Sequence, residues 1–103
     1  MSGFLLHPAA DADLDEIWEY IAEDNIDAAD RLLEEFQNAI GTLVSFPRSG
    51  HVRPDLSSRL VRFQVVREYL IAYVPDSNPM VVLAFLHGRR NPRIIAALLK
   101  QRI

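Results

Sequence analysis

The chain has 103 residues, half of them hydrophobic, which is room for a single domain, residues 1–103, with one core. It contains no cysteine, so disulfides, thiolate metal sites and a cysteine nucleophile are excluded. No apolar stretch approaches the roughly 20 residues of a membrane helix, and the first residues lack the pattern of a signal peptide. We therefore expect a cytoplasmic protein that does not contact a membrane.

The net charge of -3 conceals a strong segregation of sign along the chain. Residues 1–47 hold eleven acidic side chains and one basic one, whereas residues 48–103 hold ten basic side chains and three acidic ones. Ten of the eleven bases are arginine, the side chain suited to planar and bidentate contacts. This distribution predicts one acidic and one basic face, with the arginines serving a partner.

The first half of the chain predicts a short strand and two helices. Residues 4–6 are apolar and precede Pro8, which predicts an edge strand followed by a helix that starts at the proline. Asn25 or Asp27 can cap the second helix, which ends near Pro47. The short link predicts an antiparallel helix hairpin. The first helix carries an apolar stripe at helical spacing: Leu14, Ile17, Trp18 and Ile21.

The second half predicts three strands. Residues 59–67, 69–74 and 80–86 are rich in β-branched and aromatic side chains and are separated by turn residues, which is typical of an antiparallel meander. Residues 48–54 are expected to be a connecting loop, and residues 94–103 a short final helix. The order predicts a two-layer α+β domain in which the helix hairpin packs on one face of an antiparallel sheet.

Alternation along the first strand of the meander separates its two faces. Val61, Phe63 and Val65 share one face, so Arg62, on the other face, is expected to point to solvent or to a partner. Exposed arginines bind either phosphates or an acidic peptide, and the sequence does not separate these. The arginines from the loop onward are expected to form one basic surface: Arg48, Arg53, Arg59, Arg62, Arg67, Arg89, Arg90 and Arg93.

The remaining polar side chains do not form a familiar catalytic pattern. His7, His51 and His87 lack the spacing of paired ligands, so neither a metal nor another cofactor is expected. The carboxylates of the helix hairpin fit a solvated acidic face. The aromatic side chains are expected in the core or at its flank: Trp18, Tyr20, Phe36, Tyr69 and Tyr73.

Four segments resemble the ParE branch of the RelE/ParE toxin superfamily: residues 13–25, 43–50, 69–73 and 86–90. These proteins are the toxins of bacterial type II toxin-antitoxin, or plasmid stabilisation, modules. The resemblance implies growth arrest and one of two activities. ParE-like members inhibit DNA gyrase and replication without known cleavage chemistry, whereas RelE-like members cleave mRNA on the ribosome.

The sequence departs from the RelE-like nuclease pattern at two positions. Leu70 follows Tyr69 where the nucleases have a catalytic arginine, and residues 91–94 offer no C-terminal tyrosine. Arginine does not release a proton at neutral pH, so His87 would be the base of a nuclease site formed with Arg89 and Arg90. The departures favour a gyrase inhibitor that is not an enzyme. An mRNA endonuclease and a non-toxic member that retains only antitoxin binding and operon control stay as alternatives.

The resemblance also implies the partners. A ParD-like antitoxin is expected to neutralise the toxin, to form a hetero-oligomer with it and to bring it to operator DNA. We expect the antitoxin in the groove between the helix hairpin and the sheet. The residues expected to contact it are Trp18, Arg62, Arg67, Tyr69 and Tyr73.

Overall fold

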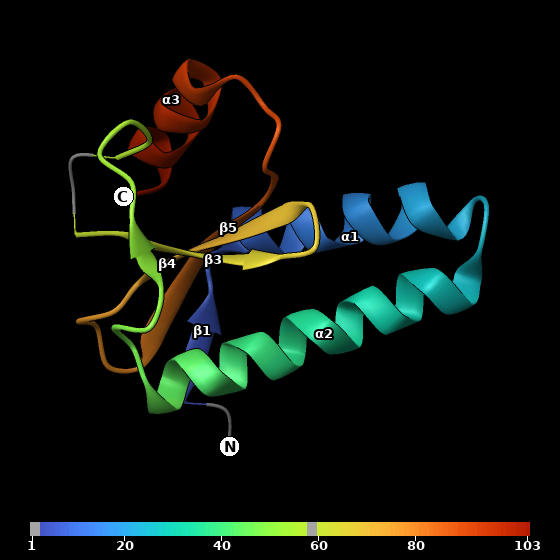
Figure 1. The fold of residues 1–103 in the computed structure, drawn as a ribbon, viewed down its shortest axis with the longest axis horizontal. Coiled ribbons are helices and arrows are strands. Elements are labelled where there is room, and N and C mark those ends of the chain that lie inside the picture. The colour runs from blue at the N-terminus through green and yellow to red at the C-terminus, as the bar shows by residue number, and fades with distance from the viewer. Residues whose placement is uncertain (1–2, 58–59) are drawn as a thin grey trace.

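The computed structural model describes residues 3–57 and 60–103, and its elements follow the expected order. Within these residues the elements are β1 (Phe4–Leu6), α1 (Pro8–Ala22), α2 (Ile26–Ser45), β2 (His51–Val52), β3 (Arg62–Val66), β4 (Tyr69–Val74), β5 (Met80–His87) and α3 (Pro92–Arg102). Figure 1 shows their arrangement. The predicted α+β architecture is confirmed. Arg59, which the sequence places on the basic surface, lies outside the described residues.

The sheet has the strand order β1-β5-β4-β3-β2. The meander of β3, β4 and β5 is antiparallel, as predicted, but β1 pairs parallel to β5, so the sheet is mixed. His51 and Val52 were expected in a loop and instead form the two-residue edge strand β2 against β3. The sequence does not reveal this strand because its partners in β3 are ten and twelve residues away.

The helices begin where local signals place them. Pro8 occupies the first turn of α1, and the imidazole Nδ1 of His7 accepts from the amide of Ala9 at 3.0 Å. Asn25 caps α2 by accepting from the amide of Ala28 at 3.0 Å, which satisfies one of the free donors of the first turn. Within the described residues, no helix is both long and apolar enough to cross a bilayer.

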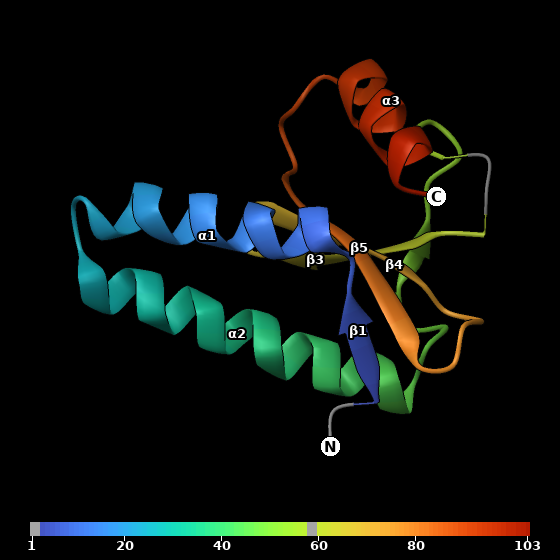
Figure 2. The ribbon, with the colours of Figure 1, turned by 180° about the vertical axis from the view of Figure 1, so that it is seen from behind.

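Two hydrophobic clusters lie on opposite faces of the sheet. One joins the hairpin to the sheet and includes Phe36, Tyr69 and Tyr73; the other lies under α3 and includes Phe63, Leu70 and Leu99. Figures 1 and 2 show α2 and α3 on opposite sides of the strands. The expected two layers therefore gain a third, partial layer, and β4 is buried on both faces.

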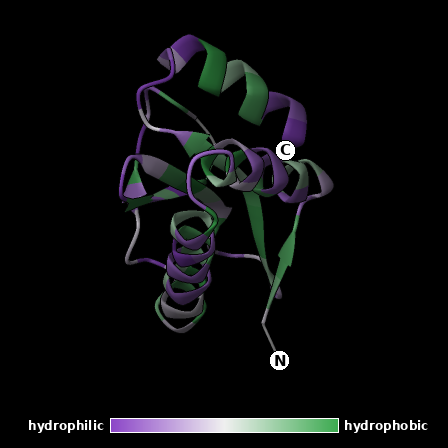
Figure 3. Ribbon diagram, turned by 90° about the vertical axis from the view of Figure 1, so that its right-hand side faces the viewer, coloured by the Kyte–Doolittle hydropathy of each residue, from purple (hydrophilic) through white to green (hydrophobic). Residues whose placement is uncertain are grey.

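The short cover provided by α3 explains which strand residues are exposed. In Figure 3, α3 is coloured hydrophobic along its middle and hydrophilic at both ends. Of its residues, only Ile95 and Leu99 are buried. Val65 shares the face of Phe63, but it does not belong to the cluster under α3 and is 55% exposed. The prediction of a common face for the two side chains is correct, whereas their burial differs.

Candidate functional site: arginines and the hairpin cleft

Salt bridges divide the arginines expected on the basic surface into two groups. Arg53 makes a bidentate pair with Asp55, at 3.0 Å and 2.9 Å, and Arg48 lies 2.5 Å from Asp76. Arg67 holds the Glu35 carboxylate of α2 with two bonds, at 2.7 Å and 2.6 Å. These three arginines already have acidic partners, so they are less available to a target.

Arg62 is half-buried, although the sequence predicts that it faces solvent or a partner. Its Nη1 donates to the carbonyl of Gly50 at 2.8 Å and to that of Arg48 at 3.2 Å. These carbonyls belong to the loop that precedes β2, which the fold places beside the start of β3. The guanidinium therefore holds this loop: Arg62 lies on the face opposite Val61 and Phe63, as predicted, but it already has partners within the chain.

The second group, Arg89, Arg90 and Arg93, follows β5 and enters α3. All three are exposed, and no acidic side chain of the described residues lies within salt-bridge distance of them. Asn91 caps α3 between them by accepting from the amide of Arg93 at 2.8 Å. We call Arg89, Arg90 and Arg93 the unpaired arginine cluster.

The pairing of Glu35 with Arg67 changes the acidity of both groups. The hydrogen bonds from Arg67 hold the pKa of Glu35 below its usual value of 4.5, and the same bonds raise the pKa of Arg67. Arg67 also has a φ of 56°, in the left-handed region that few residues other than glycine adopt. Its side chain thus ties the β3–β4 turn to α2.

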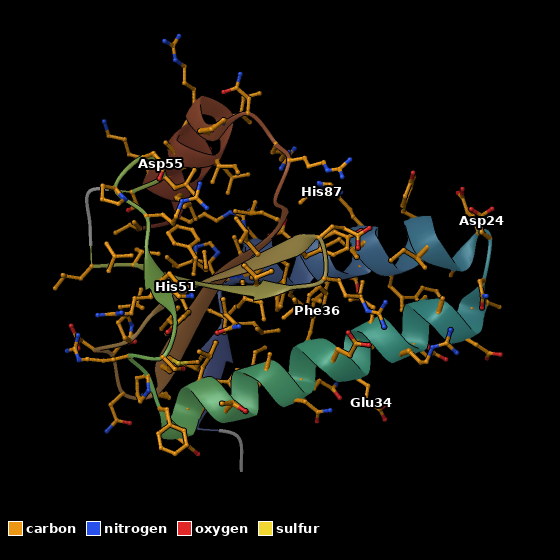
Figure 4. All side chains as sticks on the ribbon, in the orientation of Figure 1. Asp24, Glu34, Phe36, His51, Asp55 and His87 are labelled. Carbon is orange, nitrogen blue, oxygen red and sulfur yellow. The ribbon has the colours of Figure 1, made fainter. Side chains whose placement is uncertain are left out.

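His87 has a structural partner at the end of β5. Its Nδ1 accepts from the amide of Arg89 at 3.1 Å, and its ring meets Tyr69 edge to face at 5.3 Å. Figure 4 shows His87 beside α1, at the end of the sheet that the hairpin covers. These two contacts are structural ones at the strand end.

Tyr69 and Tyr73 are core residues, as the sequence predicts. Tyr73 is fully buried, and its hydroxyl donates to the carbonyl of Pro47 at 2.6 Å and accepts from the amide of Gly50 at 3.0 Å. Burial raises the pKa of both phenols. Tyr73 presents no surface to a partner, and Tyr69 is 7% exposed.

The structure does not bring Trp18 to the other residues expected to contact an antitoxin. Its indole nitrogen donates to Asp30 of α2 at 2.9 Å, and it lines a hollow formed only by side chains of the two helices. Tyr20, two residues further along α1, is 75% exposed and borders two hollows that both reach Tyr69. The sequence placed Tyr20 in the core or at its flank and did not count it among the antitoxin contacts, whereas the structure leaves its ring exposed.

The larger of these hollows, which we call the hairpin cleft, lies between α1 and the end of β5 and has a volume of about 520 Å³. Its apolar lining includes Ile17, Tyr20, Tyr69 and Phe85. Its charged lining consists of Asp13, Glu16, Glu68 and Arg90, together with His87. Within residues 3–57 and 60–103, no group of three His, Asp or Glu side chains is placed to hold a metal ion.

A mixed sheet with a helix hairpin on one face, together with the motif residues at the end of β5, defines a small toxin of the RelE/ParE type. The family model of the ParE toxin of type II toxin-antitoxin systems, parDE, matches residues 4–92, so the chain belongs to this family. It is therefore the toxin component of such a system and has a cognate antitoxin. The match ends at the first residue of α3.

Two curated relatives show the same likeness. The chain is 30% identical over 89 residues to Toxin ParE1 of Mycobacterium tuberculosis strain CDC 1551 / Oshkosh and equally to Toxin ParE1 of strain ATCC 25618 / H37Rv. Each alignment covers 85% of this chain and 91% of the relative.

Proposed function

We propose that this ParE-family toxin inhibits DNA gyrase, and thereby replication, by binding through its basic surface, and that its antitoxin holds it inactive. Membership of the ParE family carries the proposal. The identity of residue 70 supports it: Leu70 is 5% exposed and packs in the cluster under α3. The position where RelE-like chains have a catalytic arginine is thus a core position here.

The unpaired arginine cluster is the part of the basic surface best suited to a target. A cation without an intramolecular partner loses no ion pair when it binds, so its charge contributes fully to association. Arg48, Arg53 and Arg67 would first have to leave their own carboxylates. The target contact is therefore expected at Arg89, Arg90 and Arg93.

The antitoxin contact is proposed at the groove between the hairpin and the sheet. A tail that folds on binding needs apolar surface to offset its ordering. Tyr20 and Ile17 offer such surface beside Tyr69. Arg67 lies near the same groove. It can form an ion pair with an acidic residue of the tail if it releases Glu35.

Supercoiling by purified gyrase, measured with a titration of purified toxin, tests the proposed target. We expect inhibition that equimolar antitoxin reverses. Full supercoiling at a large molar excess of toxin contradicts the proposal. Primer extension on translated mRNA serves as the companion experiment, since cleavage ends that Arg89→Ala abolishes would indicate the endonuclease alternative.

A further inference from the structure

The outer edge of β5 is only partly paired. β1 pairs with the first part of β5, from Met80 to Val82, and the amide of His7 then donates to the carbonyl of Val82 at 2.9 Å. No described strand continues along this edge beyond that point. An open edge of this kind is a template for another extended segment.

The register shows which backbone groups of this edge face outward. The amide of Gly88 donates to the carbonyl of Glu68 at 2.8 Å, so Gly88 and, by alternation, Leu86 direct their backbone groups toward β4. Phe85 and His87 direct theirs away from β4. The amide of Phe85 confirms this direction, because it donates to the Asp13 carboxylate at 3.1 Å.

Phe85 and His87 each direct an amide and a carbonyl away from β4, and two of these four groups already have a hydrogen-bond partner. The Asp13 carboxylate accepts a hydrogen bond from the Phe85 amide, and the His87 carbonyl accepts one from the amide of Arg90 at 3.1 Å. No bond to the Phe85 carbonyl or to the His87 amide is found among the described residues. An incoming antiparallel strand would bond to the amide and the carbonyl of the same β5 residue. An incoming parallel strand would instead bond to the carbonyl of the residue before Leu86 and to the amide of the residue after it. The open pair has the parallel pattern, which β1 already follows on the same strand.

We propose that an extended segment of the antitoxin adds to β5 in the parallel direction, with one of its residues opposite Leu86. That residue donates its amide hydrogen to the Phe85 carbonyl and accepts from the His87 amide. The inference rests on the proposed function only in taking the antitoxin as the occupant of the hairpin cleft.

The lining of the cleft favours a peptide over a nucleic acid. Ile17 and the exposed ring of Tyr20 offer apolar contact to a side chain of the segment. Glu16 and Glu68 are exposed at the cleft, where they would repel a phosphate backbone and would attract a basic residue. Arg90 can receive an acidic residue of the same segment.

Substitution of His87 isolates its amide. Proline at position 87 removes an N–H that bonds to nothing in β4, and an edge strand tolerates proline at such a position. His87→Ala is the matched control because it removes the imidazole and retains the amide. The probe is the small protein encoded beside the toxin gene, purified and titrated by calorimetry, with circular dichroism to verify that both variants fold.

We expect His87→Pro to bind about tenfold more weakly than His87→Ala, as loss of one interfacial hydrogen bond predicts, and Tyr20→Ala to weaken binding by at least as much. Equal affinities of the two position-87 variants would overturn the inference.

Amide exchange of the wild type provides a second test that does not require any variant to fold. The His87 amide should exchange rapidly in the free toxin and become protected in the complex, whereas the Leu86 amide is protected in both. An antitoxin that binds and leaves the His87 amide unprotected overturns the strand addition and leaves the proposed function intact. If the His87 amide becomes protected in the complex but the toxin does not inhibit gyrase, the strand addition is supported and the proposed function is contradicted.

Discussion

Asp13 of α1 and Arg102 of α3 form a bidentate ion pair across nearly the whole chain, with Nη1 to Oδ2 at 2.6 Å and Nη2 to Oδ1 at 3.1 Å. The side chains are only 16% and 12% exposed. Asp13 also accepts from the Phe85 amide, and Arg102 donates to the Leu83 carbonyl at 2.9 Å. The pair therefore closes part of the open edge of β5 and fastens the last turn of α3.

Removal of either partner should destabilise the protein, because the remaining charge is left little exposed and unpaired. Arg102→Ala is expected to lower the free energy of unfolding by roughly 3 kcal/mol. Urea denaturation measures this, and Arg93→Ala, which removes an exposed arginine of the same helix without an ion pair, is the control. A cost for Arg102→Ala as small as that of the control would mean that the pair contributes little to stability.

Gly50 and Tyr73 should show coupled substitutions. A Cβ at position 50 would lie 2.4 Å from the Tyr73 hydroxyl oxygen and 2.8 Å from its Cε1, so Gly50→Ala is expected to cost about 1–3 kcal/mol. Tyr73→Phe should cost about 1–3 kcal/mol, because the Pro47 carbonyl and the Gly50 amide lose their partner. The double variant should lose less than the two single costs together, since the phenylalanine ring lacks the closest clashing atom. Additive losses in thermal unfolding would argue against this contact.

The Glu35–Arg67 pair predicts an acid-dependent contribution to stability. Because the folded pKa of Glu35 lies below 4.5, the pair stabilises fully above pH 4.5, and its contribution falls as the pH drops through the folded pKa. The difference in Tm between wild type and Glu35→Gln should thus be largest at neutral pH and should shrink below pH 4.5. Glu34→Gln, one residue away and without a salt bridge among the described residues, is the control. A constant difference from pH 7 to pH 3 would contradict the prediction.

Loss of the unpaired arginine cluster should affect inhibition of gyrase more than loss of the salt-bridged arginines does. A triple variant of the unpaired cluster, Arg89→Ala with Arg90→Ala and Arg93→Ala, should retain wild-type stability within about 0.5 kcal/mol and lose inhibition of gyrase at least tenfold. Arg48→Ala with Arg53→Ala removes paired arginines and should largely retain inhibition. Growth after induction and supercoiling assays compare the two. Equal loss in both variants would indicate that the basic surface acts as a whole.

Local signals in the sequence were sufficient for the elements and their order. The apolar stripe of α1, the Asn25 cap and the turns of the meander act between residues a few positions apart, so each can be recognised from the chain itself. The motif residues at the end of β5 likewise indicated the ParE family.

Contacts between distant residues were decided only by the tertiary structure. The sequence assigned Asp13 to a solvated acidic face, but α3 brings Arg102 against it and β5 presents an amide to it. Arg62 was expected to be free, and the loop before β2 supplies carbonyls that bind it. Whether a charged side chain is available to a partner depends on which opposite charges the fold places beside it. An unfolded chain contains the same arginines, but only the folded one separates Arg89, Arg90 and Arg93 from those that are already paired.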